Sequence, residues 1–128
     1  MQTFALRYSS TTGAASISQA WVWFNATFAN PANSCMVYYE RSTNELLLLN
    51  DAGTTWAAGV PGAAGTLQNN QCAIALANSG VGLSGNTLTL SLAMTFTASF
   101  AGGKNIYMYG AAGGVASGWQ DQGDWTVP

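Results

Sequence analysis

Residues 17–26 constrain the fold more than any other stretch, because their side chains divide into two sets with a period of two. One set is apolar and suits a protein core: Ala20, Val22, Phe24 and Ala26. The other set carries two indoles flanked by two carboxamides: Gln19, Trp21, Trp23 and Asn25. We therefore expect a β-strand whose first set faces the core and whose second set faces solvent.

Two tryptophans on a solvated strand face would form an unusual surface, because soluble proteins limit exposed aromatic patches unless a partner covers them. Neighbours on one strand face lie about 6.7 Å apart, so the rings of Trp21 and Trp23 would form a flat platform. Such a platform suits a flat, uncharged, ring-shaped ligand. The alternative is that a second sheet buries both faces, with the indoles in the core.

The rest of the chain predicts short strands, and no stretch combines helical periodicity with helix caps. The clearest strand has Leu88, Leu90, Leu92, Met94 and Phe96 alternating with small and hydroxyl side chains. Other strands are expected at residues 3–8, 35–40, 45–50, 67–76, 105–109 and 125–127. Turns or loops are expected at residues 30–34, 41–44, 50–65, 78–85 and 110–118. This pattern predicts one all-β domain over residues 1–128, an antiparallel two-sheet β-sandwich that is jelly-roll-like, with a closed barrel as the alternative.

Charge and length exclude several classes of partner. Only 6% of the residues are charged, against roughly 25% in typical soluble domains, and no basic patch is present to bind nucleic acid. No apolar run reaches the length of a membrane span. Low charge with many Thr, Asn and Gly residues is common in secreted bacterial β-domains, so we expect an extracellular protein. Met1 leads directly into strand-like sequence without a signal peptide, which suggests a module of something larger.

The two cysteines, Cys35 and Cys72, are far apart and do not have the spacing of metal ligands. In a chain of secreted character they are expected to form one disulfide. The alternative is a pair of buried free thiols.

The sequence offers little material for catalysis, and we expect no enzyme activity. Histidine is absent, which excludes the usual catalytic triad and imidazole metal ligands. Glu40 and Glu45 flank a hairpin turn, and turn chemistry explains Asp121 and Asp124. No cofactor is expected, although a structural calcium ion held by oxygen ligands is an open alternative. The weak candidates for that site are Asn50, Asp51, Asp121 and Asp124.

Binding of an uncharged sugar needs aromatic faces and amides more than ionisable groups. An indole covers the C–H face of a sugar ring, and carboxamides or carboxylates bond its hydroxyls. Beyond the strand at residues 17–26, Tyr38 and Glu40 should extend the platform from the next strand. Trp119 and Trp56, in expected loops, are further candidates, and the alternative for each is that it plugs the core. We expect Tyr107 and Tyr109 to lie in the core instead.

Several segments resemble carbohydrate-binding module family 81, whose members are non-catalytic modules attached to cellulases of soil bacteria. The segments are residues 34–39, 48–53, 65–72, 101–109, 117–120 and 123–127. The resemblance covers most of residues 34–128, includes both cysteines, and is weaker over residues 1–33. It implies a β-sandwich that binds β-1,4-glucan chains such as cellulose and cello-oligosaccharides, with xyloglucan a further candidate, and that targets an attached glycoside hydrolase to its substrate.

A second hypothesis belongs to a different class of function. The low charge, together with the multi-domain proteins in which such modules occur, also fits a structural stalk or adhesin-like domain that has no sugar ligand. Depletion of the protein by insoluble cellulose would favour the binding module over the stalk.

Overall fold

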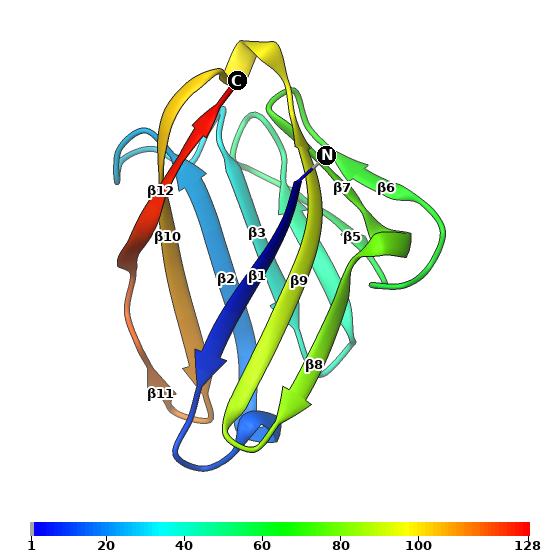
Figure 1. Cartoon of the computed structure of the whole chain (residues 1–128), viewed down its shortest axis with the longest axis vertical. Helices are drawn as coiled ribbons and strands as arrows, with labels where there is room; N and C mark the ends of the chain where they lie inside the picture. Colours follow the sequence, from blue (N-terminus) through cyan, green and yellow to red (C-terminus); the bar gives the residue numbers. More distant parts are fainter. Residues whose placement is uncertain (1) are drawn as a thin grey trace.

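The computed structural model describes residues 2–128 as two antiparallel β-sheets packed face to face (Figure 1). The first sheet contains five strands: β1 (Gln2–Ser9), β6 (Thr66–Gln68), β7 (Cys72–Ala75), β8 (Gly80–Ser84) and β9 (Thr87–Phe96). The second contains seven: β2 (Ile17–Asn25), β3 (Cys35–Glu40), β4 (Glu45–Leu49), β5 (Trp56–Gly59), β10 (Gly102–Ala112), β11 (Val115–Ala116) and β12 (Gln120–Val127). The predicted all-β, two-sheet sandwich is confirmed.

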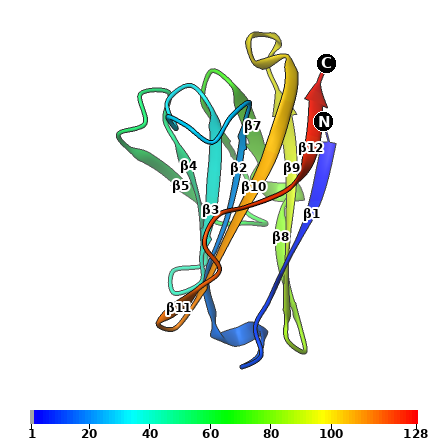
Figure 2. The ribbon, with the colours of Figure 1, turned by 90° about the vertical axis from the view of Figure 1, so that its left-hand side faces the viewer.

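The order of the strands places β2 near the middle of the second sheet. That sheet runs β11-β10-β2-β3-β4-β5, and β12 continues along β10 beside β11. The first sheet runs β1-β9-β7-β6, with β8 also paired to β9. Figure 2 shows the two layers from the side, with both chain ends at the same end of the sandwich. Within residues 2–128 the helical content is three single turns of 3-10 helix: Ala14–Ser16, Leu76–Asn78 and Ala98–Phe100.

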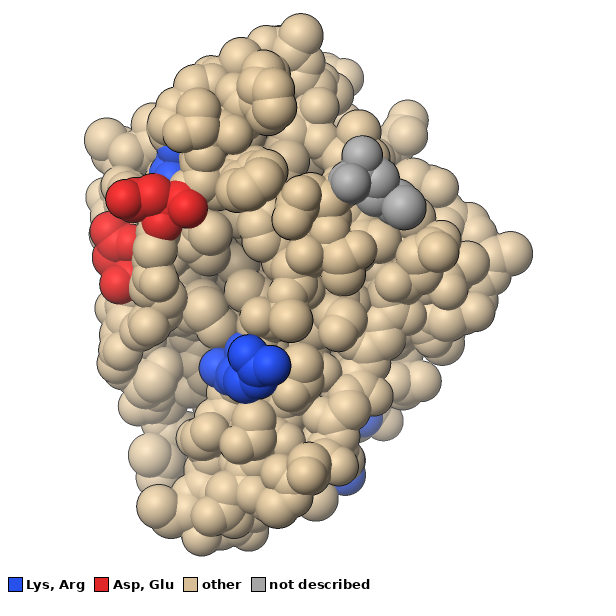
Figure 3. Space-filling model, in the orientation of Figure 1, with Lys and Arg blue, Asp and Glu red and all other residues tan. Residues whose placement is uncertain are grey.

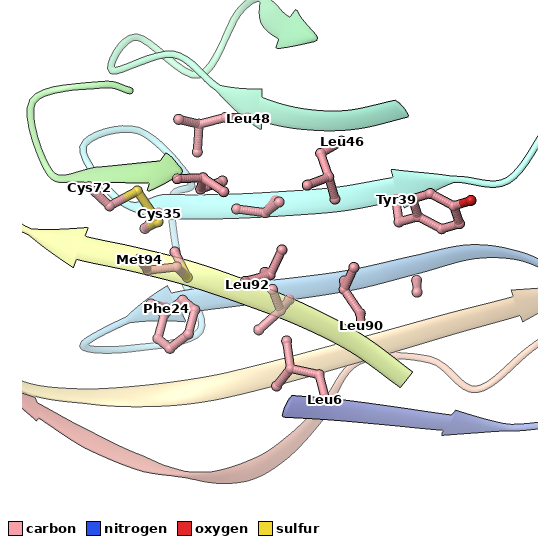
Figure 4. Packing of buried hydrophobic residues seen from close by; sticks show 14 of the residues in the cluster. Leu6, Phe24, Cys35, Tyr39, Leu46, Leu48, Cys72, Leu90, Leu92 and Met94 are labelled. Atoms are coloured by element: carbon pink, nitrogen blue, oxygen red, sulfur yellow. A yellow bond between two sulfur atoms is a disulfide. The ribbon is translucent and has the colours of Figure 1, made fainter. Parts of the chain in front are cut away.

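The core lies between the sheets and follows the predicted alternation. Leu88, Leu90, Leu92 and Met94 of β9 are fully buried there, and Phe96 packs at its margin. Across from them lie the apolar residues of β2, β3 and β4 (Figure 4). Each large apolar side chain removed from water contributes about 1.5–3 kcal/mol to stability.

Strand β2 also divides as predicted, since Ala20, Val22 and Phe24 are fully buried against the first sheet. Ala26 is an exception, because β2 ends at Asn25 and the following residues form an exposed loop.

Several predicted loops contain strands. The stretch 50–65 includes β5, the stretch 78–85 includes β8, and β10 continues to Ala112 before the short β11. The predicted single strand at residues 67–76 is a pair, β6 and β7, joined by a turn. Strands β5 and β8 are rich in Gly and Ala and have no clear side-chain alternation. Their backbone pairing with β4 and β9 holds them in the sheets instead.

The predicted disulfide is confirmed: Cys35 of β3 and Cys72 of β7 are bonded across the two sheets, 37 positions apart in the chain. Both cysteines are fully buried. By the chain-entropy account, closing a loop of this size stabilises the fold by about 3–4 kcal/mol.

The helical turns of residues 2–128 are too short to cross a membrane, and no helix in this range has the length and hydropathy of a span.

Candidate functional site

The outer face of the second sheet carries its aromatic side chains in two rows that run across the strands. Strand register aligns Tyr109 of β10, Trp21 of β2 and Tyr38 of β3 in one row. It aligns Tyr107, Trp23 and Met36 in the next row. Both tryptophans lie on the outer face of the sheet, opposite the inner set of β2, because neither belongs to the cluster between the sheets.

The first row and two tryptophans that pack edge-on against Trp21 form a continuous surface that we call the aromatic strip. Its members are Trp56, Tyr38, Trp21, Tyr109 and Trp119. All five retain exposed surface, and Trp56 is the most open at 37%. The ring centroids of the other four members lie between 4.2 Å and 6.3 Å from that of Trp21. The strip is therefore compact and centred on Trp21.

The strip is not the flat platform that the sequence predicts. The rings of Trp21 and Tyr38 are stacked with centroids 4.2 Å apart and planes inclined by 13°. Since their strands are neighbours about 4.8 Å apart, both rings must stand upright from the sheet. Trp56 meets this pair edge-on, with its ring centroid 4.9 Å from that of Tyr38 and 5.6 Å from that of Trp21. The strip is therefore a ridge, in which one face of Trp21 is covered by Tyr38.

The other side of Trp21 borders a hollow of about 260 Å³. The hollow is lined by Gln19, Trp21, Tyr109 and Trp119. The ring of Trp119 lies 6.0 Å from that of Trp21 and 5.5 Å from that of Tyr109. Three aromatic rings thus surround an open space that has one carboxamide at its edge.

Polar side chains next to the strip form a fixed chain of hydrogen bonds. The indole N–H of Trp21 donates to Oε1 of Gln19 at 3.1 Å, and Nε2 of Gln19 donates to Oε1 of Glu40 at 2.8 Å. The hydroxyl of Ser42 donates to the other oxygen of Glu40 at 3.0 Å. The bond from Gln19, helped by Ser42, lowers the pKa of Glu40 below its usual value against the effect of partial burial. Glu40 is therefore ionised at neutral pH and accepts hydrogen bonds at this margin.

The same surroundings shift the pKa of Tyr38 in the opposite direction. Partial burial, followed by the charges of Glu40 and Glu45, raises the pKa of its hydroxyl. The hydroxyl is therefore protonated at neutral pH and can both donate and accept hydrogen bonds.

The second row, which we call the covered row, is closed to solvent. Its members are Tyr107, Trp23, Met36 and Leu49, each less than a tenth exposed. The expectation that Trp23 faces solvent is therefore wrong, since only 3% of its surface is exposed. Phe28, from the loop after β2, lies over Trp23 and Tyr107 with ring centroids 5.2 Å from each.

Hydrogen bonds hold this cover in place. The indole N–H of Trp23 donates to the hydroxyl of Ser34 at 2.8 Å, and Ser34 donates in turn to the carbonyl of Pro31. Asn69, from the turn before β7, donates to the carbonyls of Ser34 and Leu49 at 3.0 Å each. Its own side-chain oxygen accepts from the amides of Gln71 and Cys72. The cover over Trp23 is thus tied to the turn that carries the disulfide.

The structure separates Asn25 from the other predicted binding residues. It lies four residues beyond Trp21 on β2, about 13 Å along the strand. Its amide donates to the carbonyl of Asn30, and its oxygen accepts from the amide of Ala26. Asn25 therefore shapes the loop after β2 and does not belong to the strip.

The candidate calcium ligands lie in two separate places. Asn50 and Asp51 occupy the turn after β4, whereas Asp121 and Asp124 lie on β12, and three strands of the sheet stand between these sites. Asn50 bonds the amides of Thr54 and Thr55 and thereby closes its turn. Residues 2–128 contain no group of three or more acidic, His or Cys side chains able to hold a metal ion.

Of the two tyrosines expected in the core, Tyr107 is buried in the covered row, whereas Tyr109 lies in the strip and keeps exposed surface. Both point to the outer face of the second sheet. Their alternation with Ile106 and Met108, which pack against the inter-sheet core, is the signal that could have placed them.

An exposed aromatic ridge bordered by a carboxylate and an amide can cover apolar C–H surfaces and bond hydroxyl groups. Glu40 and Glu45, at its margin, lie directly opposite each other across the β3–β4 hairpin. Comparison of the chain with protein-family models, with curated proteins and with solved structures finds no match.

Proposed function

We propose that this protein is a non-catalytic carbohydrate-binding module that binds β-glucan chains through the aromatic strip. The observation that carries the proposal is the strip itself: five aromatic rings that retain exposed surface cluster around Trp21 on the outer face of the sheet. Soluble proteins seldom leave such a patch open without a ligand to cover it. A neutral glucan fits a surface that has few charges and many ring faces.

Two features of the strip match the two surfaces of a glucose unit. The C–H face of one ring packs on the side of Trp21 that borders the hollow, between Tyr109 and Trp119. Its hydroxyls then reach the margin, where Glu40 accepts hydrogen bonds and Gln19 is already oriented by Trp21. Because the ligand is neutral and the contacts are mostly apolar, binding should change little with salt concentration.

The resemblance to carbohydrate-binding module family 81 supports the same function. It would place the chain beside a glycoside hydrolase in a secreted protein, where the module holds the enzyme on plant cell-wall β-glucan. The buried disulfide fits an oxidising, extracellular setting.

The test is retention of the protein on a panel of insoluble and soluble glycans, including cellulose, xyloglucan and a charged polysaccharide. We expect retention on β-glucans, and loss of retention in Trp21→Ala, because removing a central aromatic anchor typically costs 2 kcal/mol or more. Trp125→Phe is the matched control, since it alters an indole that packs on Phe4 and lies outside the strip. It should bind as the wild type does.

Two outcomes would reject the proposal. A wild-type protein retained by no glycan in the panel would favour the structural stalk. A folded Trp21→Ala variant that still binds would place the site elsewhere on the molecule.

A further inference from the structure

A second open site lies on the other side of β10 from the aromatic strip. It is a groove of about 780 Å³ between β1 and the strands β10, β11 and β12. On the face drawn in Figure 3 the surface is hollowed between β1 and β12. Its apolar lining comes from residues that also border the core between the sheets: Leu6, Ile17, Ile106, Met108 and Ala112. The groove shares Tyr109 with the aromatic strip, its other lining residues lie outside the strip, and its occupancy does not depend on the glucan site proposed above.

One wall of the groove is the free edge of strand β1. This strand pairs only with β9, and the amide of Ser10 continues that ladder by donating to the carbonyl of Asn86 at 2.9 Å. In an antiparallel ladder alternate residues bond to a given neighbour, so the even-numbered residues of β1 bond to β9. The N–H and C=O groups of Ala5, Arg7 and Ser9 therefore point to the groove, which these three residues line. Among residues 2–128, no second strand pairs with them.

The opposite wall is formed by β12, which approaches β1 only at one end. There the rings of Trp125 and Phe4 meet edge-on at 5.3 Å. Farther along, Gln120 and Gln122 line the groove, and no ladder joins the two strands. The two edges thus diverge from a closed end and leave an elongated opening parallel to β1. Residues Ala5 to Ser9 alone give it a length of roughly 13 Å.

The charged and aromatic side chains that line the groove limit the kind of ligand it can bind. Arg7 is the one charged residue in the lining, and within residues 2–128 its side chain has no ion pair or hydrogen bond. Only two aromatic side chains border the groove, and neither offers it an open ring face. Tyr8 is buried and donates its hydroxyl to the carbonyl of Trp21 at 2.8 Å, and Tyr109 belongs to the strip. The groove therefore offers no open aromatic face on which a sugar ring could stack.

We propose that the groove binds an extended peptide segment, which adds to β1 as a new edge strand. The backbone of the peptide bonds the free N–H and C=O groups of Ala5, Arg7 and Ser9. Alternate apolar side chains of the peptide lie on the floor of the groove near Ile106 and Met108. A carboxylate on the peptide pairs with Arg7, the single unpartnered cation of the lining.

The probe is a synthetic peptide, acetyl-Thr-Val-Asp-Val-Thr-Val-Thr-amide, titrated into ¹⁵N-labelled protein. Saturation should slow hydrogen exchange at the amides of Ala5, Arg7 and Ser9 by about fivefold or more, because each acquires a hydrogen bond. Two further peptides carry N-methyl groups on alternate residues. Only one edge of the peptide strand can bond to β1, and methylation of alternate residues blocks the N–H groups of one edge. One methylated peptide should therefore lose binding, and the other should retain it.

Two variants of the protein sharpen the test. Ala5→Pro removes one groove-facing N–H donor at an edge position that tolerates proline. It should weaken binding of the peptide by about fivefold or more. Arg7→Gln should weaken binding of the aspartate peptide by about two- to fivefold and leave binding of its asparagine analogue unchanged. Both variants should keep the wild-type unfolding temperature and the wild-type retention on β-glucan, which separates this test from that of the aromatic strip.

Four outcomes would overturn the proposal. The first is the absence of binding by the aspartate peptide, and the second is equal binding by both methylated peptides. The third is a response of the groove residues to cellohexaose or dodecanoate in place of the peptide. The fourth is self-association of the protein that Ala5→Pro abolishes, which would assign the edge to a second copy of this chain. If Ala5→Pro fails to fold, the methylated peptides and Arg7→Gln decide the question alone.

Discussion

Trp21 and Trp23 lie two residues apart on the same face of β2, yet they belong to different parts of the molecule. Trp21 stands in the aromatic strip, stacked on Tyr38, and keeps part of its surface open. Trp23 lies in the covered row beneath Phe28, with its indole N–H bonded to Ser34. The loop after β2 covers the second tryptophan and stops short of the first.

This difference shows that one sheet face can contain both a small core and an open aromatic surface. The covered row lies beside the strip and packs against Trp21 and Trp119. The ring centroid of Trp119 is 6.0 Å from that of Trp21 and 5.7 Å from that of Trp23. We infer that Trp23 serves stability and that Trp21 serves binding. The predictions that follow test this division.

The largest effect should come from Trp23→Ala. Removing a fully packed aromatic side chain should lower the free energy of unfolding by about 3–5 kcal/mol, as in an ordinary core. Trp21→Ala should cost less than about 2 kcal/mol, because that side chain keeps part of its surface open to water in the folded protein. Urea unfolding of both variants measures the difference, and equal losses would contradict the division.

Loss of the disulfide should have the next largest effect on the free energy of unfolding. Replacing Cys35 and Cys72 together by alanine should destabilise the fold by about 3–4 kcal/mol. The bond joins the two sheets and is buried between them, on the face of β3 opposite to Tyr38, so glucan retention by the folded fraction should be unchanged. Titration of thiols in the denatured, unreduced wild type should find none, and two reactive thiols would reject the bridge.

Asn69→Ala should have an intermediate effect of about 2–3 kcal/mol, because the side chain makes four hydrogen bonds to backbone groups. It should also raise the hydrogen exchange rate of the Trp23 indole, since Ser34 would lose its support. Unchanged exchange at that indole would mean that the cover does not depend on this turn.

The smallest effect concerns Glu40. Because Gln19 and Ser42 donate to its carboxylate, the pKa of Glu40 lies below 4.5 in the folded protein. A lowered folded pKa adds stability above the unfolded pKa, and that stability is lost as the pH falls through the folded value. The stability advantage of the wild type over Glu40→Gln should therefore shrink on acidification below pH 4.5. An advantage that is constant with pH would contradict the bonding of Glu40 described here.

The fold could be predicted from sequence where alternation is long and apolar. The Leu-rich strand β9 and the inner set of β2 follow directly from a period of two. Strands β5 and β8 are short and rich in Gly and Ala, so no side-chain pattern marks them, and pairing with β4 and β9 decides their structure.

The candidate site could be predicted only in part for a related reason. Alternation places Trp21, Trp23 and Tyr38 on one face, but it carries no information about the loop that returns over that face. Phe28 and Ser34 cover Trp23 through tertiary contacts that depend on the path of residues 26–34. Tyr109 enters the strip because β10 pairs with β2, and this pairing joins residues far apart in the chain.

The most direct test of the division between strip and covered row is a titration of ¹⁵N-labelled protein with cellohexaose, observed at the indole N–H signals. The chain contains five tryptophans, so each part of the molecule has its own probe. We predict the largest shifts at Trp21, Trp56 and Trp119, a smaller one at Trp23, and none at Trp125. A largest shift at Trp125, or no shift at any indole, would contradict the account.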